Sequence, residues 1–119
     1  MQWTIEEEPD YLRVAVEGEF VLSAALKMFD EAERVSRAGG YERILIDCRA
    51  AAGLIAEDEK FLAGTRVAQR FGSARVAAVF SPGPRITGFA GNVAARRGGN
   101  LFVTDDVKEA ESFLAGKDL

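Results

Sequence analysis

The amino-acid sequence predicts an α/β fold, a mixed and mostly parallel sheet of about five strands with four helices, in the order β-β-α-β-α-β-α-β-α. Three observations support this prediction. The chain opens with two segments in which apolar and polar residues alternate, as in β-strands. Short, almost wholly apolar segments then follow, each separated from the next by a segment with helical spacing. The length of 119 residues and the hydrophobic content of 48% suit one domain, residues 1–119.

The first two strands form a predicted hairpin. Apolar and polar residues alternate on both sides of the turn at Pro9-Asp10, and this pattern gives each strand one apolar face. The apolar positions are Trp3, Ile5, Leu12, Val14 and Val16. We therefore expect two antiparallel strands whose apolar face turns toward the core and whose acidic face turns toward water.

Helical spacing begins at Leu22. The apolar residues of this segment share one stripe, and charged residues occupy the opposite side. Ser23 is the expected N-cap of this first helix. The pair Gly39-Gly40 should end it, because glycine accepts the left-handed conformation found at helix C-termini.

Three later segments are short and apolar, as expected of strands buried on both faces of a parallel sheet. The central strand covers about residues 42–48 and opens into a predicted loop at residues 50–53. The other two strands lie at residues 75–80 and 101–103. Because a helical segment separates each strand from the next, we expect parallel strands joined by right-handed crossovers.

The three remaining helices each have a recognisable start. Glu57, Asp58 and Glu59 fall in the first turn of the second helix, where they offset the positive end of the helix dipole. We prefer this explanation to a pair of catalytic carboxylates. The apolar stripe of the third helix is Ile86, Phe89, Ala90 and Val93. Asp106 and Glu109 have the spacing of a capping box at the start of the last helix.

The chain contains no histidine and a single cysteine, Cys48. An internal disulfide is therefore excluded, and so are Ser-His-Asp and Cys-His mechanisms within the chain. The usual metal-ligand combinations are missing as well, and we predict neither a metal nor a cofactor. Without a histidine to activate it, Cys48 is expected to be a small buried hydrophobe. We predict that the protein is not an enzyme, because acid-base catalysis would need carboxylates, lysine or tyrosine with strongly shifted pKa values.

Charge is distributed unevenly along the chain. The net charge is −4, yet residues 60–100 contain seven bases and no acid, whereas residues 1–59 carry fourteen acids and six bases. Two interpretations stay open. Folding can interleave these charges into neutralising surface pairs, which we favour. The segment can also form a basic face for an acidic protein, an anionic ligand or an anionic lipid.

The sequence contains no apolar segment long enough for a transmembrane span. The N-terminus also lacks the basic region and apolar core of a signal peptide. A cytoplasmic location is therefore expected.

Three features of the chain are shared with one known family. The first is the order of elements between about residues 3 and 115. The second is the central strand with its following loop, and the third is the last strand with the apolar stripe of the last helix. The residues that carry the last two features are Ile44, Leu45, Ile46 and Asp47, then Leu101, Phe102, Val103, Thr104 and Asp105, then Val107, Ala110, Phe113 and Leu114. With these features the chain resembles the STAS family, which is shared by anti-sigma-factor antagonists and the cytoplasmic tails of sulfate transporters, and in particular its SpoIIAA-like branch. The resemblance implies a non-enzymatic module that binds partner proteins.

The resemblance also implies a switch that this sequence lacks. In the family, a serine of an Asp-Ser-Ser-Gly motif after the central strand is often phosphorylated. Ala51, Ala52 and Gly53 lie near that place here, and no hydroxyl side chain occurs between Asp47 and Thr65. The phosphorylation switch is therefore not carried over. The branch is also similar to lipid-carrying Sec14-type domains, which implies a hydrophobic pocket for a small amphipathic ligand.

Candidate binding residues follow the third strand, because ligands and partners usually bind at the carboxyl ends of parallel strands. Asp47 and Arg49 flank Cys48 at the end of the strand, and Gly53 closes the predicted loop. Asp47 can serve a ligand or partner, or it can bond the backbone of its own loop. The sequence leaves these alternatives open.

A second group of candidates follows the fourth strand. Ser81, Gly83, Arg85 and Thr87 surround the expected amino end of the third helix, where backbone N–H groups favour an anion. The Ser-Pro-Gly-Pro segment is also explained by turn chemistry alone, and we favour this simpler explanation.

A nucleic-acid partner is not expected. The glycines at positions 88 and 91 have the spacing of a nucleic-acid-clamping GxxG loop, but they lie in an apolar helical segment where close packing is the better explanation. The sequence therefore predicts a regulatory or protein-interaction module with an unidentified protein partner, which can be a second copy of the chain. The alternative is a carrier or sensor for a small apolar or anionic molecule, held between the loops after the third and fourth strands.

Overall fold

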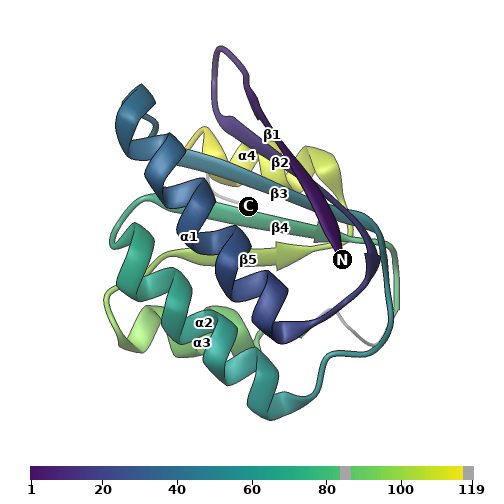
Figure 1. Ribbon diagram of the computed structural model, residues 1–119. Helices are drawn as coiled ribbons and strands as arrows, with labels where there is room; N and C mark the ends of the chain where they lie inside the picture. Colours follow the sequence, from purple (N-terminus) through teal and green to yellow (C-terminus); the bar gives the residue numbers. More distant parts are fainter. Residues whose placement is uncertain (84–86, 117–119) are drawn as a thin grey trace.

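The computed structural model of the chain describes residues 1–83 and 87–116. Its strands and helices follow the predicted order (Figure 1). The elements are β1 (Gln2–Glu7), β2 (Leu12–Glu19), α1 (Leu22–Gly39), β3 (Arg43–Ala52), α2 (Glu57–Phe71), β4 (Arg75–Phe80), α3 (Phe89–Arg96), β5 (Leu101–Thr104) and α4 (Val107–Leu114). The strands form one sheet in the order β1-β2-β3-β4-β5.

The sheet is mixed, as predicted. β1 pairs antiparallel with β2, and β2, β3, β4 and β5 are parallel neighbours. In the hairpin, Trp3 lies opposite Val16 and Ile5 lies opposite Val14. The alternating pattern therefore places the apolar side chains of both strands on the same face of the sheet.

Helices lie on both faces of the sheet. α1 and α2 lie in front of it in Figure 1, and α4 lies behind β3, β4 and β5. Alternate residues of β3 enter different cores: Ile44 and Ile46 belong to the large core beneath α1 and α2, whereas Leu45 packs with Ala110 and Leu114 of α4. This burial on both sides explains the continuous apolar sequence of the central strand.

β3 is longer than the sequence predicts. A loop is expected from Ala50 onward, but the strand continues to Ala52. The cause is the pairing with β2, in which Ala50 lies opposite Glu17 after a β-bulge. The carbonyl oxygen of Ala52 also accepts a hydrogen bond from the N–H of Phe20, at 2.9 Å. Alanine has a low strand propensity, and this tertiary pairing overrides it.

Two predicted helix starts are tested by the capping contacts. The prediction for α1 is wrong: Val21 and not Ser23 is the N-cap, and no side chain caps it. The prediction for α2 is confirmed, since the three acids occupy its first turn. The carboxylate of Glu59 also accepts a hydrogen bond from the N–H of Ala56, at 2.9 Å.

The last two helices begin at Phe89 and Val107. Ile86, which the sequence places in the third helix, lies outside the described residues. Asp106 caps α4 by accepting hydrogen bonds from two backbone N–H groups, as predicted. The side chain of Glu109 accepts a hydrogen bond from Thr104 at 2.9 Å and does not complete the capping box.

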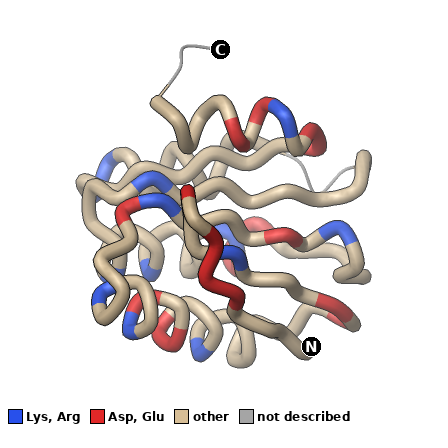
Figure 2. The backbone as a smooth tube through the Cα atoms, turned by 90° about the horizontal axis from the view of Figure 1, so that it is seen from above, with Lys and Arg blue, Asp and Glu red and all other residues tan. Residues whose placement is uncertain are grey.

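Folding brings acids and bases from different parts of the chain together, and the two kinds of residue are interspersed in Figure 2. Arg66 and Arg70 of α2 both donate to the carboxylate of Asp30 in α1, at 2.9 Å each. The ammonium group of Lys60 lies 3.4 Å from the carboxylate of Glu57. For three of the seven bases of this segment, Lys60, Arg66 and Arg70, the contacts agree with the favoured interpretation, in which folding pairs the bases with acids.

None of the helices in the described part of the chain is long and apolar enough to cross a membrane.

Candidate functional site

A small apolar cavity of about 80 Å³ lies between the sheet and helices α1, α2 and α3. It includes residues from the carboxyl ends of β3 and β4 and from the two loops that follow these strands. The lining residues are Met1, Val16, Phe20, Ala25, Met28, Phe29, Ile46, Cys48, Ala51, Ile55, Lys60, Ala63, Ala78, Phe80, Thr87, Ala90, Leu101 and Val103. The cavity is therefore part of the large core and lies at the end of the sheet where ligands bind in α/β proteins.

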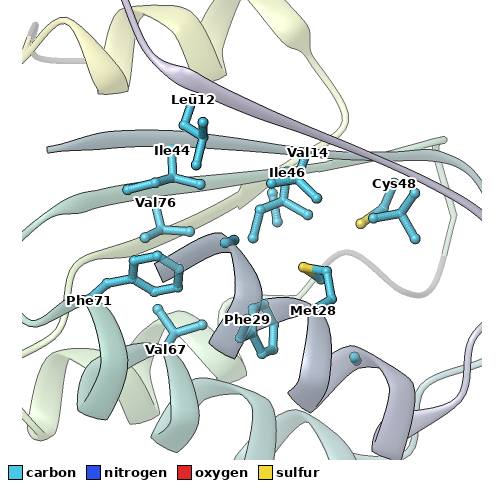
Figure 3. Close-up of a cluster of buried hydrophobic side chains, with 14 of the residues drawn as sticks. Leu12, Val14, Met28, Phe29, Ile44, Ile46, Cys48, Val67, Phe71 and Val76 are labelled. Atoms are coloured by element: carbon cyan, nitrogen blue, oxygen red, sulfur yellow. The ribbon is translucent and has the colours of Figure 1, made fainter. Parts of the chain in front are cut away.

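The cavity exists because short side chains meet in this part of the core. Alanines from α1, α2, α3, β3 and β4 contribute to the wall, and each leaves space that a larger side chain would fill. Met28 of α1 and Cys48 of β3 lie close to this region and project between the sheet and the helix in Figure 3. A methionine wall can adjust to the shape of a bound molecule because its thioether side chain is unbranched and flexible.

Cys48 is buried, as the sequence predicts, and its side chain forms part of the cavity wall.

Lys60 is the one charged side chain among the described residues that line the cavity. Only 8% of its side chain is exposed. Its ammonium group donates hydrogen bonds to the hydroxyl oxygen of Thr87 at 3.2 Å and to the carboxylate of Glu57 at 3.4 Å. The ammonium group of Lys60, together with the hydroxyl of Thr87, thus adds a polar group to a cavity whose other described lining residues are apolar.

Lys60 was not among the residues that the sequence singled out. The sequence contains a signal that could have identified it, because Lys60 precedes Gly64, Val67 and Phe71 by four, seven and eleven residues. These are the spacings of one helical stripe. The stripe is the buried side of α2. A lysine at such a position cannot reach water as an ordinary surface lysine does.

Five large apolar side chains of the described residues are exposed, and each is the direct sequence neighbour of a residue that lines the cavity. They are Val21, Leu54, Phe61, Leu62 and Phe89, and we call them the apolar rim. Leu54 has the highest exposed fraction of the five, 78%. Exposed apolar groups of this kind mark surfaces that bind ligands or partners when they are contiguous.

Asp47 and Arg49 form a separate cluster on the other face of the sheet. Asp47 follows Leu45 by two residues in β3 and therefore points to the side of α4. Its carboxylate accepts two hydrogen bonds from the side chain of Arg49, at 2.7 and 2.9 Å, and one from Arg13 at 2.5 Å. It also accepts from the backbone N–H of Arg49, at 3.1 Å. We call Arg13, Asp47 and Arg49 the ionic cluster.

The ionic cluster keeps its carboxylate charged. The side-chain hydrogen bonds from Arg49 lower the pKa of Asp47 below the ordinary value of 3.8. Burial acts in the opposite direction, while the backbone N–H of Arg49 and the charges of Arg49 and Arg13 lower the pKa further. Of the two alternatives that the sequence left open for Asp47, the structure shows the hydrogen bond from the backbone of its own segment, and a role toward a ligand or partner stays a prediction.

Among the other candidate residues that the structure describes, Thr87 is the one that lines the cavity. Ser81 follows β4 and is half-buried, and Gly83 is exposed in the next turn. Gly53 follows β3 with a φ of 91°, a conformation that favours glycine. Arg85 lies outside the described residues. The structure thus separates Asp47 and Arg49 from Thr87, and their roles in binding stay predictions.

Within residues 1–83 and 87–116, no group of three or more Cys, Asp and Glu side chains could hold a metal ion.

Comparisons with known proteins identify the fold. No protein-family model and no curated protein matches the chain. Among solved structures, it is similar to an uncharacterised protein of the DUF3478 family from Shewanella loihica PV-4, whose crystal structure has a SpoIIAA-like fold. The two share 22% sequence identity with a TM-score of 0.52, over 95% of this chain and 92% of that one. The chain therefore has the SpoIIAA-like, STAS-type fold that its order of strands and helices predicts.

Proposed function

We propose that the chain is a non-enzymatic binding module that holds a small, largely apolar molecule in the cavity beneath α1, α2 and α3. The observation that carries this proposal is the cavity itself, a space of about 80 Å³ whose lining within residues 1–83 and 87–116 is apolar except for Lys60 and Thr87. Ligand sites in proteins combine an apolar wall with a few polar groups in this way. The function is that of a sensor or carrier.

The volume limits the size of the ligand. An engineered apolar cavity of about 150 Å³ binds benzene, which has six carbon atoms. A cavity of about 80 Å³ accommodates roughly half of that, or about three carbon atoms. A long lipid chain does not fit in this conformation, so the proposed ligand is smaller than a cargo of the Sec14 type.

The non-enzymatic character of the module is supported by the state of its carboxylates. Asp47 is paired with two guanidinium groups and has a lowered pKa, which is the opposite of what a general acid or base at neutral pH requires. The three acids at the start of α2 lie in its first turn, where they offset the positive end of the helix dipole.

A second candidate function is the binding of a protein partner, and the apolar rim favours it. Leu54 and Val21 are large apolar side chains with high exposure, and each is the sequence neighbour of a residue that lines the cavity. The fully buried centre of a protein interface is more apolar than the rest of the protein surface. A regulatory module of this kind would bind an unidentified protein, or a second copy of the chain, in the cytoplasm. The cytoplasmic location and the dimer stay predictions.

Filling the cavity tests the proposed function. Replacing Ala63 by leucine adds three carbon atoms at the wall, about the volume that the cavity offers. We expect Ala63→Leu to fold with unchanged or higher stability and to lose xenon binding, measured by xenon-129 NMR and by the backbone amide spectrum of the protein.

Gln69→Leu is the matched control, because it adds a leucine to an exposed position of the same helix. It should leave xenon binding as in the wild type. Equal xenon binding by the wild type and Ala63→Leu would show that the probe occupies another place and would overturn the proposal.

A further inference from the structure

We infer that Lys60 selects a ligand with an anionic head group, so that the cavity takes a short-chain carboxylate whose hydrocarbon part enters the apolar space. This inference rests on the proposed function and names its class of ligand. It depends on three observations, namely the burial of Lys60, its partners, and the position of its ammonium group at an apolar cavity.

The first observation is that a charged group is buried in the core. Lysine side chains in apolar surroundings normally extend until the ammonium group reaches water. The side chain of Lys60 is only 8% exposed and lines the cavity. Burying an ammonium group costs free energy unless strong partners compensate for the lost hydration.

The second observation is that the partners of Lys60 are weak. Charge-assisted hydrogen bonds between ammonium and carboxylate groups are typically about 2.7–2.9 Å long. The carboxylate of Glu57 lies at 3.4 Å, and 67% of its side chain is exposed to solvent. The other partner, the hydroxyl of Thr87 at 3.2 Å, is uncharged. An ammonium group has three N–H donors, and the described residues supply these two acceptors.

The third observation is that the two polar side chains of the wall lie together, since Lys60 donates to Thr87. They come from α2 and the loop before α3, and the other described residues of the wall are apolar. An inorganic anion would use the ammonium group and leave the apolar space unfilled. A neutral apolar molecule would fill the space and leave the ammonium group with its weak partners. A carboxylate with a short hydrocarbon chain satisfies both parts, and its oxygens can accept from Lys60 and Thr87 together.

Glu57 would then compete with the ligand for Lys60. Its exposed side chain can turn into solvent when a ligand carboxylate arrives, and the remaining repulsion between the two carboxylates would weaken binding. Removing the charge of Glu57 should therefore strengthen the binding of an anionic ligand, whereas removing the charge of Lys60 should weaken it. This opposite response distinguishes a ligand-binding lysine from one that only stabilises the helix start.

The test uses butanoate and butanamide, two probes of nearly the same shape that differ in charge. The three carbon atoms beyond the polar head of each probe match the volume of the apolar space, and the head is expected to meet Lys60 and Thr87 at its polar end. Affinities are measured by NMR titration of the full chain. We expect butanoate to bind more tightly than butanamide, with the largest shift changes at residues that line the cavity.

Three variants complete the experiment. Lys60→Met preserves the volume of the side chain and should reduce the affinity for butanoate roughly tenfold or more, with little effect on butanamide. Glu57→Gln should raise the affinity for butanoate by up to about fivefold. Lys27→Met, which removes an exposed lysine of α1, is the control and should change neither affinity.

The outcomes separate this inference from the proposed function. Equal binding of both probes, or an equal loss of both in Lys60→Met, would overturn the role of Lys60 and leave an apolar-ligand module. Xenon binding without butanoate binding would have the same meaning. If neither probe nor xenon binds, the proposed function is wrong as well. Tighter butanoate binding by Glu57→Gln together with weaker binding by Lys60→Met supports the inference.

Discussion

Replacing Gly64 by alanine is expected to lower the free energy of unfolding by roughly 2–3 kcal/mol. Gly64 lies on the buried side of α2, where this helix packs against α3. A β-carbon at this position would lie 2.5 Å from the carbonyl oxygen of Ala90 and 3.2 Å from the β-carbon of Val93. The first contact is with backbone, so α2 and α3 would have to move apart.

The direction of this effect is opposite to that of helix propensity. Alanine is favoured over glycine in a helix by up to about 1 kcal/mol, so a Gly64→Ala variant without a steric conflict would be stabilised. Gly88→Ala is the control for steric conflict, because a β-carbon at Gly88 meets no atom of the described residues closer than 3.8 Å. The measurement is urea unfolding followed by circular dichroism. A Gly64→Ala variant as stable as the wild type would show that the helices do not pack this closely.

Replacing Asp47 by asparagine is expected to lower the free energy of unfolding by about 2 kcal/mol at pH 7. The substitution leaves the guanidinium groups of Arg13 and Arg49 next to each other without the carboxylate that neutralises them. Asp47 is 9% exposed, which makes the loss larger than that of a surface ion pair. Both arginines remain partly exposed, so the loss should stay below that of a fully buried pair.

Asp30 provides a matched control for this prediction. It also accepts from two arginines, Arg66 and Arg70, but 41% of its side chain is exposed. Solvent screens its interactions, and Asp30→Asn should therefore cost only about 0.5 kcal/mol. An equal loss of stability in the two variants would contradict the view that burial makes the ionic cluster contribute more to stability than the exposed ion pairs of Asp30.

The contribution of Asp47 should depend on pH in a defined direction. Its pKa in the folded protein is below the ordinary value of 3.8. The stabilisation is then fully present above the unfolded pKa of about 4 and is lost as the pH falls through the folded pKa. The difference in stability between the wild type and Asp47→Asn should accordingly be constant near neutral pH and shrink in acid. A difference that grows as the pH falls below 4 would contradict this assignment.

Most of the fold could be predicted from the sequence because each element has a pattern of its own. The alternation around Pro9-Asp10 predicted the hairpin, and the continuous apolar residues of the central strand predicted burial on both faces. The acids at the start of α2 predicted its first turn. The end of β3 could not be predicted, because residues 50–52 are alanines and their strand conformation depends on the pairing with β2.

The candidate site was less predictable than the fold. Thr87 was among the predicted binding residues and lines the cavity, but Lys60 was counted only as part of a basic segment. The cavity itself depends on five alanines from five different elements, and no local pattern shows which of them meet. Their arrangement follows from the packing of helices on the sheet.

The sequence by itself therefore determined the order of the elements and the sides on which their apolar residues lie, because both follow from local periodicity. Only the tertiary structure decided which polar groups meet. It placed Asp47 between Arg13 and Arg49 on the α4 side of the sheet and Lys60 at the apolar cavity on the other side. The physical reason is that pairing and burial depend on contacts between residues far apart in the chain.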